Sequence, residues 1–291
     1  MAKNDFKAFA IGNGANVMSQ ADYEALSALA SGFLSGKASS AQVNKAIRQS
    51  STIAAVVAQF MADSTGSDVL DNGDTALLLN ILKSALNNQA EGRLLRIQVF
   101  TASGAWVKTV GTKKVRIKAW GAGGGGKGTN VNEGAPSGAG GAYVEGLYDV
   151  SALSGANIVI GAGGAAVAAG NAGNGGDGGD TTITALGISA GGGKGGNSAG
   201  NSAGGIPGAP SIGTIFSVAG QGGQGGQSAS DIGLGGIGGG SHSSYGGLPH
   251  VSSAGDDGFF PGGGGAGASY GAVAMASGKG ANGYVIIEEY A

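Results

Sequence analysis

Two different spacings of apolar residues divide the first 120 residues of the chain. Between residues 20 and 88 the apolar positions recur about every 3.6 residues, which is the period of an α-helix that buries one face. From Leu94 onward apolar and polar residues alternate, which is typical of a strand with one buried face. The pattern therefore predicts a helical N-terminal region followed by strands.

Residues that can cap helices set the limits of three predicted helices. A Ser or Asp side chain just before a helix accepts a hydrogen bond from one of the first free backbone N–H groups. The predicted helices, with the capping residue in parentheses, span 20–34 (Ser19), 41–63 (Ser39 or Ser40) and 75–88 (Asp74). Residues 1–18 are expected to form an irregular arm. Three short helices give a lone monomer a thin core, so oligomerisation is expected.

Short runs of alternating residues predict strands through the rest of the chain. Two of these runs flank Gly111-Thr112-Lys113 and predict a hairpin. The last run contains Tyr284-Val285-Ile286-Ile287, which is apolar on both faces and indicates a central strand of a sheet. The predicted strands span residues 95–100, 105–110, 115–120, 142–150, 156–160, 180–185, 214–219 and 283–290.

Glycine becomes abundant abruptly after Trp120. Of the 65 glycines, 56 lie in residues 121–291, about a third of that stretch against a usual share of about 7%. Many recur every third residue, which is the period of a polyproline-II-type helix with no internal hydrogen bonds. Glycine faces at this spacing would let such helices pack together and hydrogen-bond to each other. The glycines in this register are Gly161, Gly164, Gly170, Gly173, Gly176 and Gly179; Gly220, Gly223 and Gly226; and Gly233, Gly236 and Gly239.

These patterns together predict an α+β protein in three parts. Short helices occupy residues 1–92, a β neck occupies 93–120, and an all-β glycine-rich domain occupies 121–291. In that domain, polyglycine-II-like segments are expected between short strands. A disordered, silk-like chain is the alternative, because glycine loses the most backbone entropy on folding. That alternative does not explain the interspersed strands.

Charge and composition exclude several classes of function. Residues 1–120 carry 13 Lys and Arg against 8 Asp and Glu, whereas residues 121–291 carry 3 against 10. An acidic glycine-rich half does not suit nucleic-acid binding, which needs a concentrated basic surface. The absence of cysteine excludes disulfides and thiolate metal sites. With no apolar signal core and no long apolar run, the product is expected to be made in a cytosol and not to insert into membranes.

Two glycine-rich stretches come close to ligand-binding motifs without completing them. Residues 121–129 resemble a phosphate-binding P-loop, but Gly128 stands where Ser or Thr must follow Lys127. Residues 175–180 match part of a calcium-binding β-roll repeat, which works only in tandem copies. No catalytic constellation, metal site or cofactor site is predicted, and the chain is expected not to be an enzyme.

Large aromatic residues stand out inside the glycine-rich loops. Rigid rings flanked by Asp, Ser and Asn suit recognition of a sugar or a protein surface, because they give contact area at low entropy cost. Phe259 and Phe260 are equally well suited to anchoring their loop inward. The residues concerned are His242, Tyr245, His250, Phe259, Phe260 and Tyr270.

Several stretches resemble the tail fibre proteins of tailed bacteriophages and prophages. The N-terminal region of such fibres is similar to Phe9-Ala-Ile-Gly-Asn-Gly-Ala-Asn-Val-Met-Ser-Gln-Ala-Asp-Tyr-Glu-Ala-Leu26, to Gly32-Phe33 and Ser50-Ser51, and to the stretches 60–63 and 71–74. Their glycine-rich C-terminal domain is similar to 101–106, to the strand that ends in Trp120 with its four-glycine run, and to 283–288. The resemblance covers nearly the whole chain.

The resemblance implies a tail fibre that acts as a homotrimer in the virion tail after synthesis in the host cytoplasm. The N-terminal helices would attach to tail or baseplate proteins, and the glycine-rich tip would adsorb to a bacterial surface receptor. That receptor would be lipopolysaccharide or another glycan, or alternatively an outer-membrane protein. The other functions considered are a tail connector or decoration protein and a capsule depolymerase. The candidate receptor-binding residues are His242, Tyr245, His250, Phe259 and Phe260, with Asn130 and Asn132 second.

Overall fold

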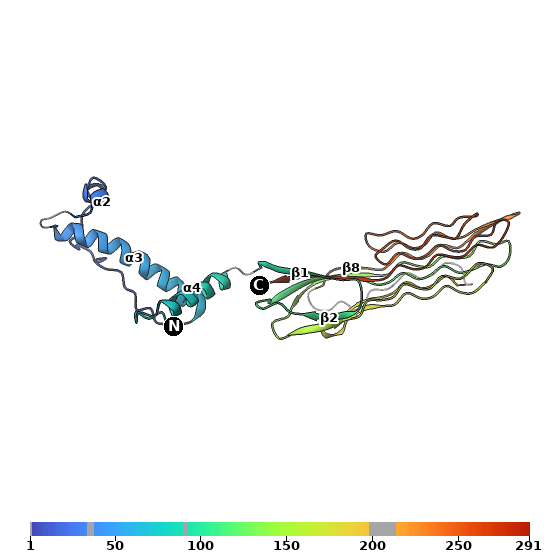
Figure 1. Cartoon of the computed structure of the whole chain (residues 1–291), viewed down its shortest axis with the longest axis horizontal. Helices are drawn as coiled ribbons and strands as arrows, with labels where there is room; N and C mark the ends of the chain where they lie inside the picture. Colours follow the sequence, from blue (N-terminus) through green and yellow to red (C-terminus); the bar gives the residue numbers. More distant parts are fainter. Residues whose placement is uncertain (1, 34–37, 90–91, 198–213) are drawn as a thin grey trace. The chain divides into compact units, whose positions relative to one another are not determined.

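The chain folds into two compact units, Met1–Glu91 and Gly92–Ala291 (Figure 1). The computed structural model describes residues 2–33, 38–89, 92–197 and 214–291. The first unit contains helices and the second contains small antiparallel sheets. This arrangement confirms the predicted α+β class. The strands near residues 94–120 belong to the same unit as the glycine-rich segments.

The helix predicted over residues 20–34 is wrong in its extent. Two short helices, α1 (Gln20–Glu24) and α2 (Ala28–Ser31), occupy most of that range, while Leu34 and the break at Ser35-Gly36 lie outside the described residues. Ser19 caps α1 as predicted, because its side chain accepts a hydrogen bond from the Asp22 backbone N–H. Neither helix buries a residue. Without packing, helices this short gain too little to extend further.

The long helix α3 (Ser40–Thr65) and α4 (Thr75–Gln89) form the core of the helical unit. Ser39 caps α3 in a capping box with Gln42, and Gly66 ends it in the left-handed conformation at φ 68°. Asp74 caps α4 by accepting a hydrogen bond from the Leu77 backbone N–H. The buried side chains between the helices are those of Ala58, Met61, Ala62, Val69, Ile81 and Ala85.

A five-stranded antiparallel sheet organises the second unit. Its order is β1 (Leu94–Phe100), β11 (Tyr284–Tyr290), β3 (Lys114–Trp120), β4 (Tyr143–Asp149) and β8 (Thr214–Val218). The terminal strand β11 is central, as its two apolar faces predicted. Two smaller sheets, β2 (Gly104–Val107) with β5 (Gly155–Ile158) and β6 (Thr181–Ile183) with β7 (Ile188–Ala190), pack their apolar side chains with the inner face of the large sheet.

The hairpin predicted around Gly111-Thr112-Lys113 is wrong. Strand β2 pairs with β5, and β3 pairs with β11 and β4. Trp106 explains the difference, because its ring is buried in the core and its Nε1 donates to the buried Glu289 carboxylate at 2.6 Å. The connection from β2 to β3 therefore leads from one layer to the other, and Val110 on it is 97% exposed.

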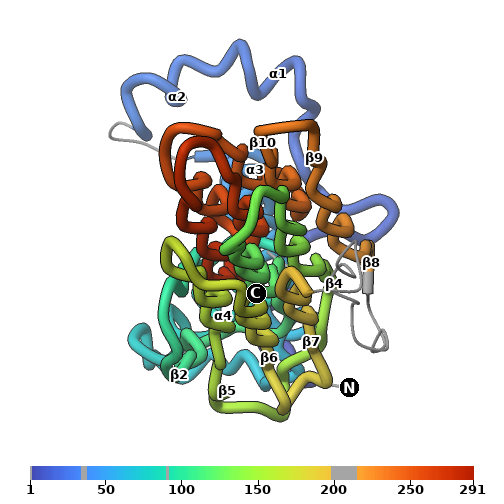
Figure 2. The backbone as a smooth tube through the Cα atoms, turned by 90° about the vertical axis from the view of Figure 1, so that its right-hand side faces the viewer, coloured from blue at the N-terminus to red at the C-terminus, as the bar shows by residue number. Residues whose placement is uncertain are grey.

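Between the strands run extended segments that are neither helix nor strand. They lead away from the large sheet and lie side by side, as the end-on view shows (Figures 1 and 2). Two further short strands, β9 (Gln227–Ala229) and β10 (Ile232–Leu234), form a hairpin between two of these segments. The segments span residues 121–128, 134–142, 161–167, 173–180, 191–196, 220–226, 235–240, 246–248, 255–258, 263–269 and 276–283.

Hydrogen bonds between these segments repeat every three residues. In segment 121–128 every backbone N–H donates to a carbonyl of another segment, and three successive residues donate to three different neighbours. This arrangement satisfies backbone groups that no helix or strand pairs. The acceptors are Ala142, Ala139 and Pro136 for Gly121, Gly124 and Lys127; Gly179, Gly176 and Gly173 for Ala122, Gly125 and Gly128; and Ala281 and Gly278 for Gly123 and Gly126.

Packing between the segments leaves no room for side chains at the contact points. A Cβ atom on Gly126 would lie 1.8 Å from the carbonyl oxygen of Ala266, and one on Gly124 would lie 2.2 Å from that of Lys194. The buried residues with side chains in this region are mostly small, among them Ala122, Ala139 and Ser137. Backbone contacts therefore hold this part of the unit together in place of an apolar core.

Candidate functional site

The extended segments carry loops at both ends. At the end far from the large sheet lie 129–133, 168–172, 227–234, 249–254 and 270–274, which we call the distal loops (Figure 1). Asn132 Nδ2 donates to the Ser230 carbonyl at 2.9 Å, and Gly233 forms a β-bridge with Tyr270. These contacts link loops that are far apart in the sequence. Loops 241–245 and 259–261 lie beside the large sheet, and we call them the sheet-end loops.

A groove of about 340 Å³ lies next to the distal loops and contains His250. Leu234, Ile237, Leu248 and Pro249 line it with apolar surface, and Gln224 and Gln227 add amide groups. His250 Nε2 lies 3.0 Å from Asp256 Oδ1, and both side chains are partly exposed. The groove thus combines an apolar lining with hydrogen-bonding groups, as ligand sites commonly do.

A second groove of about 340 Å³ contains Asn130. It shares Gly225 with the first groove, so the two are neighbours on one surface. Its lining is more polar and includes Lys127, Thr129 and Glu133. Lys127 Nζ donates to the Ala172 carbonyl at 2.6 Å, which ties loop 168–172 to this groove.

An aromatic row crosses the outer face of the large sheet. Tyr284 on β11, Trp120 on β3 and Tyr143 on β4 occupy directly opposite positions on adjacent strands. The ring centroids of Trp120 lie 4.7 Å from Tyr143 and 5.4 Å from Tyr284. Three further rings complete the row: Phe216 of β8 and, from the sheet-end loops, His242 and Phe260.

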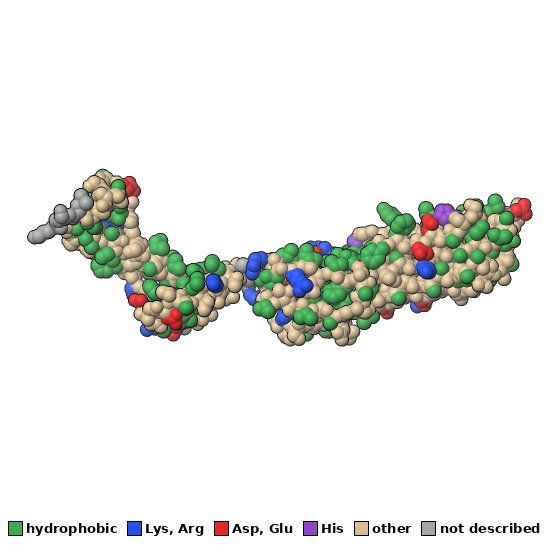
Figure 3. Space-filling view, in the orientation of Figure 1, with side chains coloured by type: hydrophobic (Ala, Val, Ile, Leu, Met, Phe, Trp, Pro, Cys, Tyr) green, Lys and Arg blue, Asp and Glu red, His purple; other side chains and the backbone are tan. Residues whose placement is uncertain are grey.

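A network of paired charges lies next to the aromatic row on the same face. On β3, Arg116 pairs with Glu145 of β4, and Lys118 Nζ lies 2.9 Å from Glu288 Oε1 of β11. The hydroxyls of Tyr143 and Tyr290 donate to Glu145 and Glu288 at 2.7 and 2.8 Å. In the space-filling view, Lys and Arg side chains gather over this part of the unit (Figure 3).

The charge network shifts the pKa values of its members. Burial by itself would raise the pKa of Glu145, but hydrogen bonds from Tyr143 and Arg116 outweigh it and hold that pKa below its ordinary value. The pKa of Glu288 is lowered in the same way, against its own burial, by hydrogen bonds from Lys118 and Tyr290. Burial, with the hydrogen bond to Glu145, raises the pKa of Tyr143. At neutral pH these two carboxylates are therefore ionised.

The residues predicted to bind a receptor fall into two groups. His242 and Phe260 belong to the aromatic row, and beside them Tyr245 is 78% and Phe259 is 55% exposed. His250, Asn130 and Asn132 lie in the distal loops. Phe259 and Phe260 are both half-exposed, although the Phe260 ring also packs edge-on against Tyr284 at 5.0 Å.

Sequence reasoning missed the sheet residues of the aromatic row. Trp120, Tyr143, Phe216 and Tyr284 lie in or at the ends of predicted strands, where aromatic residues are common. A signal was present in the last strand, where Tyr284, Ile286 and Glu288 alternate with the buried Val285 and Ile287. That alternation indicates a second, partly exposed face.

The residues of the two incomplete motifs form hydrogen bonds and an ion pair with other segments of the protein. Every backbone N–H from Gly121 to Gly128 already donates to another segment, so none of these N–H groups is available to a phosphate. Asp177 pairs with Lys194 and accepts from the Gly195 N–H, while Asp180 accepts from the Gly192 N–H. Within the described ranges, no three His, Cys, Asp or Glu side chains cluster as metal ligands.

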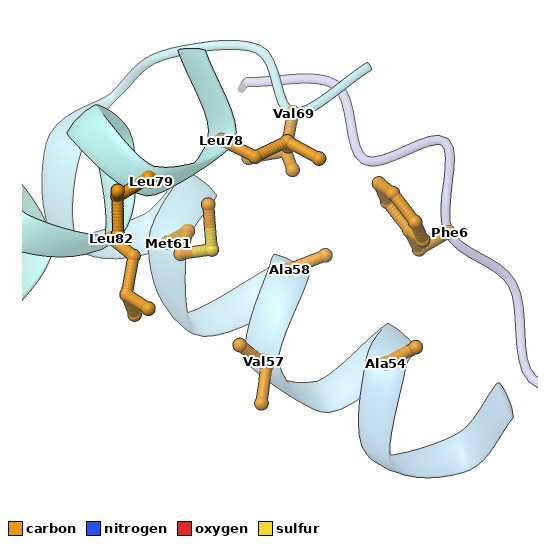
Figure 4. Close-up of a pocket in the computed structure, with 9 residues that line it drawn as sticks. All are labelled: Phe6, Ala54, Val57, Ala58, Met61, Val69, Leu78, Leu79 and Leu82. Atoms are coloured by element: carbon orange, nitrogen blue, oxygen red, sulfur yellow. The ribbon is translucent and has the colours of Figure 1, made fainter. Parts of the chain in front are cut away.

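The helical unit has an apolar groove of its own, of about 240 Å³ (Figure 4). Residues of α3 and α4 line it together with Phe6 from the N-terminal arm and Val69 from the connecting segment. Leu79 at its edge is 50% exposed, and Val57 is 40% exposed. Among the helices described, none is long and apolar enough to cross a membrane.

Comparison with known proteins identifies the family of the larger unit. A family model described as a glycine-rich domain matches residues 101–290, about two thirds of the chain. The chain therefore belongs to this glycine-rich domain family. A search of curated proteins finds no match.

Proposed function

We propose that the protein is a tail fibre of a tailed bacteriophage or of a phage-derived particle, and that it adheres to a bacterial surface without catalysis. The observation that carries the proposal is the way the extended segments are held together. Nearly all of their backbone hydrogen bonds join one segment to another, and Gly134, whose N–H donates to Ser228, is an exception; most positions of the distal loops are therefore free to vary in sequence. A rigid scaffold that presents variable loops is suited to recognition.

We further propose that the extended segments are polyglycine-II-like helices. The hydrogen bonds of segment 121–128 repeat every three residues and all lead to other segments. This is the behaviour expected of a helix with three residues per turn and no internal hydrogen bonds. The close approach of neighbouring backbones at Gly124 and Gly126 supports the same assignment.

The helical unit is proposed to attach the fibre to tail or baseplate proteins and to associate as a homotrimer. Its apolar groove and the exposed Val57 and Leu79 support this role, because soluble monomers rarely leave such surfaces uncovered. Three copies would raise the avidity of weak receptor contacts well above that of one copy. The protein would thus act in the virion tail.

The proposed receptor is a glycan of the bacterial surface such as lipopolysaccharide, and the alternative is an outer-membrane protein. His250 and Asn130 at the two distal grooves, with Asn132 in the same loop as Asn130, are the proposed receptor contacts at the tip. The combination of apolar lining with amide and imidazole groups supports a sugar ligand, which offers both apolar faces and hydroxyls.

Binding of the labelled full-length protein to intact host cells tests this proposal. Replacing loop 249–254 by a Gly-Ser loop of equal length, together with Asn130→Ala and Asn132→Ala, is expected to abolish binding while the oligomeric state is kept. Val110→Ser, at an exposed position away from the distal loops, is the matched control. Periodate treatment of the cells should remove binding to a glycan, whereas protease treatment should remove binding to a protein receptor. A full-length protein that binds no host cells would contradict adhesion and favour a connector role.

A further inference from the structure

We propose that the aromatic row on the outer face of the large sheet is a second binding site, which takes a neutral oligosaccharide. The inference rests on the proposed adhesive function for its biological setting, but its site is distinct from the distal loops. It is carried by three features of the row: the arrangement of its rings, their exposure, and the pairing of the neighbouring charges.

The rings form a row that reaches across four adjacent strands. Phe216 and His242 lie at one side, Trp120 and Tyr143 at the centre, and Tyr284 with Phe260 at the other side. Three steps between neighbouring strands amount to roughly 14 Å. The exposed rings at the two sides of the row, with the exposed His242 between them, therefore span more than one pyranose ring, which suits a short oligosaccharide.

Buried rings hold exposed rings in fixed positions. Tyr143 is 2% and Trp120 is 7% exposed, and His242 stacks on Tyr143 at 4.1 Å with 21° between the planes. Trp120 Nε1 donates to the His242 carbonyl at 2.8 Å and so fixes that loop as well. Phe216 and Phe260 keep about half of their surface exposed. The row is thus ordered before a ligand arrives, which lowers the entropy cost of binding.

The exposed side chains of the aromatic row suit a saccharide chemically. The C–H face of a pyranose is apolar and gains from covering ring surface, while its hydroxyls need hydrogen-bond partners. Within the described part of the chain, no residue forms a hydrogen bond with the ring nitrogens of His242. One nitrogen of a neutral imidazole donates and the other accepts, so the ring can serve a hydroxyl in either role.

The neighbouring charges favour a neutral ligand. Arg116 and Lys118 are balanced by Glu145 and Glu288, and each cation already lies against a carboxylate. A polyanion would have to displace these carboxylates from Arg116 and Lys118. A polycation would have to displace Arg116 and Lys118 from the carboxylates. A neutral saccharide leaves the ion pairs intact. Its binding therefore requires no free energy to break them, which favours this ligand class.

Binding of defined saccharides to the full-length protein tests the inference. The probes are neutral O-antigen oligosaccharides with maltoheptaose as a neutral reference and a heparin hexasaccharide as a polyanion, measured by saturation-transfer NMR and calorimetry. We expect a neutral probe to bind and the polyanion not to bind. His242→Ala and Phe260→Ala should each weaken binding on the order of tenfold, because each removes one stacking surface. Both substitutions remove partly exposed side chains, and unchanged thermal unfolding would show that the fold is kept.

Val110→Ser, at an exposed position outside both proposed sites, is the matched control and should leave saccharide binding unchanged. The inference is overturned if no neutral probe binds, if both ring substitutions leave binding intact, or if His242→Ala changes the oligomeric state, since the row would then be an interface between copies. None of these results would change the outcome of the loop 249–254 replacement, which tests the proposed adhesive function separately. Conversely, saccharide binding at the row with no adsorption to cells would contradict the proposed function alone.

Discussion

Single glycines decide whether the extended segments can pack. Gly126 shows this most clearly, because a Cβ atom there would overlap the Ala266 carbonyl oxygen, and neither backbone can move without breaking other hydrogen bonds. We expect Gly126→Ala to lower the free energy of unfolding by about 3 kcal/mol, as overpacking of a tight interior does. Chemical denaturation followed by circular dichroism measures the change.

Gly104→Ala is the control for that substitution. Gly104 lies in β2, has no positive φ, and leaves open space within 4 Å of the point where a Cβ atom would lie. Its replacement should therefore change stability by less than about 1 kcal/mol. Equal losses in the two variants would mean that backbone contacts between the segments do not limit stability.

A buried carboxylate stabilises the core between the sheets. Glu289 is fully buried, and its Oε1 accepts from Trp106 Nε1 at 2.6 Å and from Gln98 Nε2 at 3.1 Å. Glu289→Ala would leave the Trp106 N–H without its partner, so a loss of about 3 kcal/mol is expected. Glu289→Gln keeps an acceptor oxygen and should lose less. Thermal and urea unfolding of the two variants, beside Glu133→Ala at an exposed position, gives the comparison.

At the scale of elements, the charge network makes the large sheet sensitive to acid. The pKa values of Glu145 and Glu288 are lower in the folded state than in the unfolded chain, so their ionised forms stabilise the fold. This contribution is complete above the unfolded value of about 4.3 and is lost as the pH falls through the lower folded values. Stability should therefore decrease as the pH falls below about 4.3.

The double variant Glu145→Gln, Glu288→Gln tests the source of that decrease. Free energies of unfolding measured by urea titration between neutral and acid pH should depend less steeply on pH in the variant than in the parent. The pKa of Asp177 is also lowered, by its hydrogen bond to Lys194, so some acid sensitivity should persist in the variant. Identical pH profiles would show that the network does not stabilise the sheet.

Elements with strong local signals were predictable, and those that depend on distant partners were not. The limits of α3 and α4 follow from Ser39, Gly66 and Asp74, which act within a few residues of themselves. The partner of β2 is set by Trp106 meeting Glu289, a contact 183 residues away along the chain. Strands as short as β7, β9 and β10 carry too few residues for alternation to show.

The candidate site was predictable to a similar degree. The sequence singles out His242 and Phe260 because glycine surrounds them, but it does not indicate that they meet Trp120 and Tyr143 on a sheet face. It likewise places His250 only eight residues from His242, whereas the chain between them leads from the sheet end to the distal end of the unit. Proximity in sequence is a poor guide where each segment runs the length of the unit.

For the whole molecule, the helical unit is the place to test association. Leu79 borders the apolar groove and is half-exposed, so a charge there costs the monomer little but would be buried and unpaired in an interface formed at the groove (Figure 4). If the protein is a homotrimer joined at this groove, Leu79→Glu should convert it to monomers, as measured by analytical ultracentrifugation. Ser84→Glu adds the same charge to an exposed position of α4 and should leave the trimer intact.

If both substitutions dissociated the trimer, the added negative charge on α4 would be the cause, and the result would not locate the interface at the groove. A trimer that survives Leu79→Glu would place the contact elsewhere and leave the groove to a tail or baseplate protein. Association should in turn govern adhesion, because avidity depends on the number of linked binding sites. A monomeric Leu79→Glu variant should therefore keep the affinity of each saccharide site while losing most of its binding to intact cells. Calorimetry measures the affinity of a single site, and cell binding of the same preparation measures avidity, so the comparison separates the two.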